Sequence, residues 1–203
     1  RAADDYRETL RSVVEETERL SRLAERLLVL SREDSGEGLS WRMFRLDEAV
    51  RAAAGDIAGA ASRAGIEVLV DGLPAVEVEG DRDLIRQVFD NLLDNAVKYS
   101  TAGGTVTVGG CCDDGRVVIE VKDKGIGIPE DALARVFDRF YRVDASRSRR
   151  TGGVGLGLSI ARAVVERHGG TIEAMSAPGR GSTLRVSLPA VCGESSNAKI
   201  KEA

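Results

Sequence analysis

Cysteine and histidine are scarce in this chain of 203 residues. The three cysteines, Cys111, Cys112 and Cys192, include no CxxC pair and are odd in number. A disulfide framework needs paired cysteines and an oxidising compartment, so this pattern fits a reducing cytosol better. The cysteine spacing also gives no indication of a metal site.

Long apolar runs and an excess of basic residues are missing too. No uninterrupted apolar segment approaches the roughly 18 residues that cross a bilayer, and the first residues form no signal-peptide pattern. We therefore expect a soluble, cytoplasmic fragment. The chain has 29 Lys and Arg against 33 Asp and Glu, a net charge of −4. This balance argues against a nucleic-acid or anionic-membrane partner, since both require a positive field.

Residues 1–35 carry an apolar pattern with alternating spacings of four and three, with charged residues between. The pattern predicts a long helical arm that packs in a bundle; the alternative is a terminal helix lying on its own domain. Glycines make residues 36–40 a predicted hinge. The apolar positions of the arm are Tyr6, Leu10, Val13, Thr17, Leu20, Ala24 and Leu27.

Residues 41–190 mix strand and helix patterns without strict alternation, which predicts an α/β fold of the two-layer sandwich type. Asp47 and Asp81 are the predicted N-caps of its two long helices. Residues 191–203 form a polar tail, expected to fray. The expected strands are 41–46, 66–70, 75–78, 106–108, 117–121, 171–175 and 182–188, and the expected helices are 47–64, a segment from Asp81 through Val97, 130–136 and 156–167.

Asn91, Asn95 and Lys98 have i, i+4, i+7 spacing within the second of these helices. This spacing places two amide oxygens and one ammonium on the same helix face. Magnesium prefers oxygen ligands and keeps several waters, so an amide beside substrate phosphates can hold it without a cage of carboxylates. The face therefore predicts a site for a phosphate-bound magnesium ion.

Two glycine-rich segments follow this helix in the sequence. Asp123 ends a predicted strand, and its carboxylate can accept a hydrogen bond from an exocyclic amine while Gly125 and Gly127 let the backbone approach a flat ring. The alternative is an acidic turn in which the glycines only supply positive φ.

The second segment, Gly153, Gly155 and Gly157, opens a helix whose N-terminal N–H groups suit phosphate oxygens. Its spacing matches neither a P-loop nor a Rossmann fingerprint. The arginine-rich stretch 139–153 just before it is predicted to be a mobile surface loop.

Together these motifs resemble the catalytic and ATP-binding domain of bacterial sensor histidine kinases, within the family of gyrase-type and chaperone-type ATPases. The resemblance covers residues 41–190, and the arm looks like the second helix of the family's dimerisation and phosphoacceptor bundle, with some similarity to metal-responsive sensors. The matching boxes are Asn91 to Tyr99, Asp123 to Gly127, Phe137 to Arg142, Gly153 to Gly157 and Gly179 to Thr183.

The resemblance implies a role for each matching residue, with ATP and Mg²⁺ as cofactors. Asn95 would coordinate the metal, Asn91 and Lys98 would contact phosphates, and Arg142 would reach toward the γ-phosphate, so Asn91, Lys98 and Arg142 are the implied catalytic residues. The implied nucleotide-binding set is Asn91, Asn95, Lys98, Tyr99, Asp123, Gly125, Gly127, Ile128, Gly153, Gly155, Leu156, Gly157 and Thr183.

The implied activity is phosphoryl transfer to a protein histidine. Hydrolytic relatives usually have glutamate where this chain has Asn91, and an amide cannot accept a proton from water at neutral pH. The one histidine, His168, is expected to have a structural role at a helix C-terminus, so the acceptor would lie on a bundle helix absent from this fragment.

The resemblance further implies a homodimer formed through the arm, a response-regulator partner, and a full-length protein anchored in the bacterial inner membrane. The alternatives are an anti-sigma-type protein-serine kinase, against which the arm argues, and a non-catalytic nucleotide-sensing dimerisation module.

Overall fold

The structure is a computed structural model that describes residues 40–143 and 155–190. The chain divides into two units, Arg1–Gly38 and Leu39–Ala203. Several predicted features lie outside the described residues: the arm (1–35), the hinge apart from Ser40, the part of the arginine-rich stretch from 144 to 153, which includes Gly153, and the tail (191–203).

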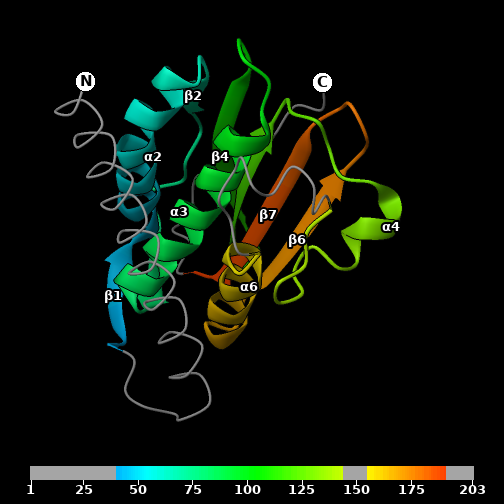
Figure 1. Cartoon of the computed structure of the whole chain (residues 1–203). Helices are drawn as coiled ribbons and strands as arrows, with labels where there is room; N and C mark the ends of the chain where they lie inside the picture. The colour runs from blue at the N-terminus through cyan, green and yellow to red at the C-terminus, as the bar shows by residue number, and fades with distance from the viewer. Residues whose placement is uncertain (1–39, 144–154, 191–203) are drawn as a thin grey trace, which may run out of the picture. The chain divides into compact units, whose positions relative to one another are not determined.

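A five-stranded mixed sheet forms one layer of the domain, in the order β2-β4-β5-β7-β6 (Figure 1). β2 is parallel to β4, and the other neighbours are antiparallel. A separate two-stranded sheet pairs β1 with β3. The strands are β1 Arg42–Arg45, β2 Glu67–Val70, β3 Glu77–Gly80, β4 Thr105–Asp113, β5 Arg116–Asp123, β6 Thr171–Ser176 and β7 Ser182–Pro189.

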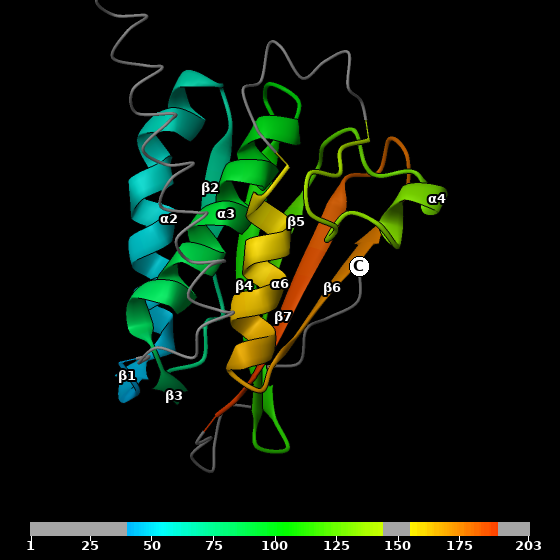
Figure 2. The ribbon, with the colours of Figure 1, turned by 60° about the horizontal axis from the view of Figure 1, so that its bottom comes forward.

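Helices cover one face of this sheet (Figure 2). α3 Arg82–Tyr99 contacts both α2 Leu46–Arg63 and α6 Gly157–Arg167, and a short α4 Glu130–Leu133 lies beside β6. The two layers confirm the predicted α/β sandwich. Within the described residues, no helix has the length and apolar character needed to cross a membrane.

The core lies between the helices and the sheet. The apolar stripe of α3 is buried as predicted, with Phe89, Leu92 and Leu93 fully enclosed. Burying each such side chain contributes about 1.5–3 kcal/mol relative to leaving it exposed. Alternate residues of the two central strands face these helices, as expected for strands with one buried face: Val106, Val108, Val117, Ile119 and Val121.

The N-caps of the two long helices differ from each other. Asp81 caps α3 as predicted, since its side chain accepts hydrogen bonds from the N–H groups of Asp83 and Leu84. The prediction for Asp47 is wrong, because the N-cap position of α2 is two residues earlier, at Arg45, and the helix begins at Leu46. The Asp47 carboxylate instead binds the Arg45 guanidinium at 2.9 and 3.0 Å.

The β4–β5 hairpin turns at Asp114 and Gly115, as predicted. Both residues have positive φ, 45° and 71°, which matches the right-handed twist of the flanking strands. β4 is longer than predicted, because it continues through Gly109 and Gly110 to Asp113. The Val118 carbonyl oxygen and the Ile119 side chain occupy the space that a Cβ on Gly110 would need, so glycine is required there although it has low strand propensity.

The cysteines of β4 also differ from each other. Cys111 is a free thiol. Cys112 is disulfide-bonded, so the expectation of reduced cysteines is wrong for this residue.

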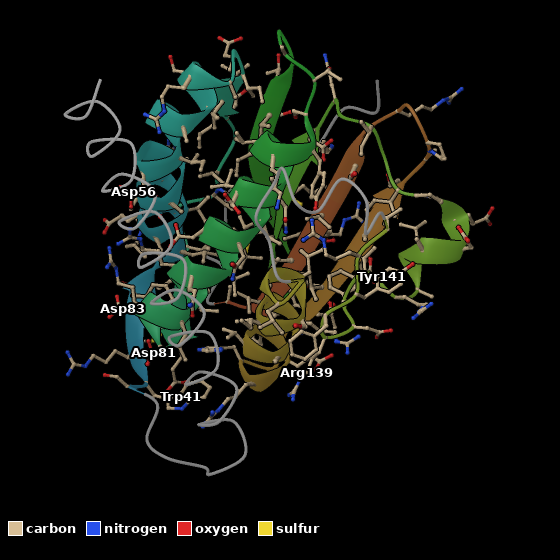
Figure 3. All side chains as sticks on the ribbon, viewed as in Figure 1. Trp41, Asp56, Asp81, Asp83, Arg139 and Tyr141 are labelled. Carbon is tan, nitrogen blue, oxygen red and sulfur yellow. The ribbon has the colours of Figure 1, made fainter. Side chains whose placement is uncertain are left out.

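His168 has a structural role at the C-terminus of α6, as predicted. The side chain is 6% exposed, its Nε2 accepts a 3.0 Å hydrogen bond from the Asp81 N–H, and its Nδ1 lies 2.7 Å from the Val164 carbonyl oxygen. Since Nε2 accepts, the proton of the neutral ring is on Nδ1, which donates to Val164. Trp41 packs on the imidazole with ring centroids 5.2 Å apart, and Figure 3 shows Trp41 and Asp81 at the same end of the domain. His168 therefore links Trp41, the residue before β1, to the start of α3 and the end of α6.

Replacing His168 with alanine is expected to lower the free energy of unfolding by about 2–3 kcal/mol, because one buried and one part-buried hydrogen bond are lost and the Asp81 N–H loses its acceptor. Chemical denaturation measures the change. Glu166→Gln, at an exposed position of the same helix, is the matched control and should change stability by no more than about 0.5 kcal/mol. Equal stability of His168→Ala and the parent would contradict this role.

Candidate nucleotide site

Asn91, Asn95 and Lys98 lie on α3 with the predicted spacing. Asn91 is buried, with 5% of its surface exposed, whereas Asn95 and Lys98 are half-buried. A Cβ built on Gly157 would lie 3.2 Å from the Asn91 Oδ1, so a larger residue would press on the amide. Glycine at this position allows the N-terminus of α6 to approach the amide face of α3.

The N-terminus of α6 is suited to an anion. Leu156 occupies the N-cap position with a fully buried side chain. Among residues 40–143 and 155–190, no side chain caps this helix, and its first turn has no acidic residue. The Ser159 hydroxyl donates to the Leu156 carbonyl at 2.9 Å. The first N–H groups of α6 and the positive end of its dipole therefore lie beside Asn91.

Asp123 ends β5 and is surrounded by hydrogen-bond donors. Its Oδ1 accepts a 2.8 Å bond from the Gly125 N–H, and Ser182 donates from both its backbone N–H and its hydroxyl. Burial raises the pKa of the Asp123 carboxyl, and these hydrogen bonds oppose the shift. An ionised carboxylate offers about four lone-pair positions, so three protein donors leave room for a ligand donor.

Gly125 and Gly127 let the loop after Asp123 pack closely. A Cβ on Gly125 would collide with the Tyr99 carbonyl oxygen, and a Cβ on Gly127 with the Ala177 carbonyl oxygen. Gly127 also has a φ of 70°, which favours glycine. Both glycines are thus needed for the loop itself, and their approach to a bound ring stays a prediction.

The C-terminal end of α3 meets the same loop. The Ile126 N–H donates to the Tyr99 carbonyl at 3.2 Å, and Ser100 forms a β-bridge with Gly125. Tyr99 is 39% exposed, and the Lys98 Nζ lies 5.5 Å from its ring centroid. The structure therefore brings the end of α3 to the loop that follows Asp123.

Thr183 lies away from this cluster. Asp123 pairs with Ser182, and Thr183 pairs with Lys122. Because neighbouring strand residues point to opposite faces, Thr183 faces away from the carboxylate and Ser182 faces toward it. The Ser182 contact also appears in the hydrogen bonds to Asp123.

Sequence reasoning missed Ser182 and also Ser176, whose hydroxyl accepts the Ile128 N–H at 2.8 Å. Ile128 is thus held by its backbone beside these serines. The only signal for Ser182 was strand register, which places the first residue of β7 opposite the last residue of β5.

Phe140 and Gly155 join the chain on either side of residues 144–154. The Phe140 N–H donates to the Gly155 carbonyl at 3.0 Å, and both residues have positive φ, 64° and 78°. Arg142 follows Phe140 closely and is half-buried. Its reach toward a phosphate stays a prediction.

These features define a nucleotide-binding domain of the ATPase type: amides on one helix, the N-terminus of a second helix beside them, and a half-buried carboxylate at the end of the sheet. Residues 80–191 match the family described as Histidine kinase-, DNA gyrase B-, and HSP90-like ATPase. The match covers more than half of the chain. The chain belongs to this family.

The similar proteins include sensor histidine kinases. Sensor histidine kinase WalK of Bacillus subtilis is 51% identical over 114 residues, which are 55% of this chain and 19% of WalK. Sensor-like histidine kinase SenX3 of Mycolicibacterium smegmatis is 38% identical over 187 residues, 92% of this chain and 49% of SenX3. The chain therefore spans about half or less of the length of these relatives.

Solved structures agree with the sequence relatives. Full-length ShkA in complex with AMPPNP superposes with a TM-score of 0.74 and 28% identity, over 86% of this chain and 36% of ShkA. The mycobacterial sensor histidine kinase MprB superposes with a TM-score of 0.66 and 30% identity, over 74% of this chain and 97% of that structure. Together these comparisons identify the domain as a histidine-kinase catalytic ATP-binding domain.

Proposed function

We propose that this domain binds ATP with magnesium and, within a longer protein, transfers the γ-phosphoryl group to a histidine on a bundle helix. One observation carries the proposal: α3 holds Asn91 against the N-terminus of α6 and brings Tyr99 to the loop after Asp123. Asn91 and Tyr99 lie roughly 12 Å apart along the helix axis. A nucleoside triphosphate can extend over such a span, with its base at Asp123 and its phosphates at α6.

Each end of the site has a separate task. Asp123 accepts the exocyclic amine of adenine, and Tyr99 packs near the base. Ser182 replaces Thr183 in this proposal, because Ser182 is the residue that contacts Asp123. At the other end, Asn91 and Lys98 contact the phosphates and Arg142 reaches the γ-phosphate, with the backbone around Gly153, Gly155, Leu156 and Gly157 supplying N–H donors.

The residues present fit magnesium. The described parts of the chain contain no group of three or more His, Cys, Asp or Glu that could hold a metal ion, so a caged site is not available there. The Asn95 amide oxygen is a ligand that magnesium accepts when phosphate oxygens and water complete its shell. A bound magnesium ion would neutralise phosphate charge at this end of the site.

Asn91 favours transfer over hydrolysis. Its amide cannot remove a proton from water at neutral pH, so attack by water is slow. In the transfer, an imidazole nitrogen of the acceptor forms a bond to the γ-phosphorus. The bond from that phosphorus to the β–γ bridging oxygen breaks, and ADP leaves with the bonding electrons. Positioning and charge stabilisation supply most of the rate enhancement.

Labelled ATP tests this function directly. The chain is incubated with [γ-³²P]ATP and magnesium, with and without a separately expressed bundle that carries an acceptor histidine. Acid-labile label is expected on the bundle only in the complete mixture, and none is expected on His168, which is buried and hydrogen-bonded at both ring nitrogens. Label on His168, or ATP binding without any transfer, would contradict the proposed transfer.

The same experiment separates the alternatives. Acid-stable label on serine of a partner would indicate the anti-sigma type of protein-serine kinase. Nucleotide binding with no transfer to any bundle would indicate a nucleotide-sensing dimerisation module.

The remaining proposals concern the longer protein. Residues 1–35 would form the second helix of the bundle, residues 36–40 the hinge, and residues 41–190 the catalytic domain. The bundle would make a homodimer and pass its phosphoryl group to a response regulator, in a protein anchored in the bacterial inner membrane. Sedimentation over a range of concentrations tests the dimer, and a concentration-independent monomer would count against it.

A further inference from the structure

Three polar side chains line up across the end of the sheet. Asp123 on β5 pairs directly with Ser182 on β7, and Ser182 pairs directly with Ser176 on β6. Residues that are opposite each other in neighbouring strands point to the same face. Ser176 is therefore in line with the carboxylate, one strand beyond Ser182.

The Ser176 hydroxyl connects three segments. Its Oγ accepts the Ile128 N–H at 2.8 Å, lies 2.6 Å from the Gly181 carbonyl oxygen, and lies 3.2 Å from the Ser182 Oγ. A hydroxyl has one proton and two lone pairs. The shorter contact takes the proton, so Ser176 donates to Gly181 and accepts from Ile128.

The Ser182 hydroxyl proton is directed to Asp123. Ser182 donates its hydroxyl and its backbone N–H to the carboxylate. With both serine protons committed elsewhere, the 3.2 Å contact between the two serine oxygens is a packing contact that limits where the Ser182 side chain can lie. The neighbouring Ser176 thereby limits the orientations in which Ser182 can donate.

The segments that Ser176 joins also contact each other. The Gly179 N–H donates to the Ile126 carbonyl at 2.8 Å. The Gly127 and Gly181 backbones fit so closely that a Cβ on Gly127 would collide with the Ala177 carbonyl oxygen, and one on Gly181 with the Asp123 carbonyl oxygen. The hydrogen bonds of Ser176 join the loop after Asp123 to the turn before β7, and its oxygen also contacts the Ser182 hydroxyl.

We propose that Ser176 is a positioning residue for base recognition, which fixes Ser182 and the Ile128 N–H so that the Asp123 carboxylate presents an acceptor to the purine amine. The inference rests on the proposed nucleotide function and adds to it a residue outside the nucleotide-contacting set. Ser176 acts through Asp123 and does not itself contact the ligand.

The test compares two nucleotides in calorimetry. ATP has the exocyclic amine, and purine riboside triphosphate lacks it. In Ser176→Ala, the Kd for ATP is expected to rise about tenfold and the Kd for the analogue about twofold, because only ATP depends on the aligned carboxylate. The preference for ATP over the analogue therefore falls about fivefold. Ser176→Thr keeps the hydroxyl and should restore the preference to within about twofold of the parent.

Two further measurements separate positioning from folding. Thr171→Ala, at an exposed position of β6, is the matched control and should leave both Kd values unchanged. Amide hydrogen exchange at Ile128 should accelerate in Ser176→Ala and stay slow in Ser176→Thr, even if the melting temperature of the alanine variant falls.

The calorimetry distinguishes a failure of the proposed nucleotide function from a failure of the positioning role of Ser176. A parent chain that binds neither nucleotide overturns both proposals. A parent that binds ATP, with Ser176→Ala weakening both nucleotides equally or neither, overturns the positioning role and leaves the nucleotide site intact.

Discussion

Replacing Asp123 with asparagine is expected to weaken ATP binding by about 100-fold. The amide loses the charge that attracts the purine amine, and its NH₂ group faces donors from Gly125 and Ser182. A hydrogen bond to a charged group contributes about 1.5–3 kcal/mol, and about 2.7 kcal/mol corresponds to 100-fold in affinity. Isothermal calorimetry with ATP and magnesium measures the change. Asp113→Asn, at the exposed end of β4, is the control and should bind like the parent.

The loss of ATP affinity in Asp123→Asn should not be accompanied by a comparable loss of folding stability. Burial raises the pKa of Asp123, so the folded state holds the proton more tightly than the unfolded state does. The free energy of unfolding therefore decreases as pH rises through the raised pKa and the carboxyl group ionises. It stays at this lower value at neutral pH. Removing the charge removes this loss of stability, whereas the amide NH₂ loses hydrogen bonds from the protein donors, so the two effects on the melting temperature oppose each other and the net change should be small. Lost affinity together with a large fall in melting temperature would mean that Asp123 is mainly structural.

The same raised pKa gives a pH dependence. In the parent, affinity for adenosine should fall as pH drops through a value above the ordinary carboxyl pKa, because the protonated group has lost its negative charge. Adenosine avoids the titration of the phosphates. The affinity of Asp123→Asn should stay flat over the same range.

The second large effect is expected for Asn95→Ala, which should slow phosphoryl transfer to the bundle by about 1,000-fold. The variant lacks the proposed amide ligand for magnesium, and loss of one preorganised group at developing charge typically costs about 100- to 1,000-fold. Initial rates with [γ-³²P]ATP measure the loss. Asp94→Ala, at the exposed neighbouring position of α3, is the control and should retain at least half of the rate.

A separate binding measurement assigns the Asn95 effect to the metal. ADP binding in the presence of EDTA should differ by no more than about twofold between Asn95→Ala and the parent, because no magnesium is available to either. If ADP binding without magnesium fell as far as the transfer rate, Asn95 would act on the nucleotide or on the fold instead.

Local patterns predicted much of this domain. The apolar period of α3, its cap at Asp81, and the turn at Asp114 and Gly115 depend on neighbouring residues in the chain, and the structure has all three. The alignment of Asn91 and Asn95 on α3 also follows from helical geometry alone. These parts of the site could be derived before any tertiary contact was known.

Features that depend on distant residues were not predictable in the same way. The pairing of β1 with β3 joins Phe44 to Val78 across the intervening helix α2. The choice of Ser182 over Thr183 follows from the β5–β7 register, and a register shifted by one residue would reverse which of them faces Asp123. Asp47 is not a cap because α2 already begins at Leu46, and the Asp47 carboxylate binds Arg45 instead.

The turn at Asp114 and Gly115 offers an attachment point for experiments on this domain. β5 runs from Arg116 to Asp123, so the turn and the carboxylate are separated by the strand's length, roughly 23 Å at about 3.3 Å per residue. A peptide tag inserted between Asp114 and Gly115 could therefore anchor the molecule to a sensor chip while leaving the opposite end of the hairpin accessible.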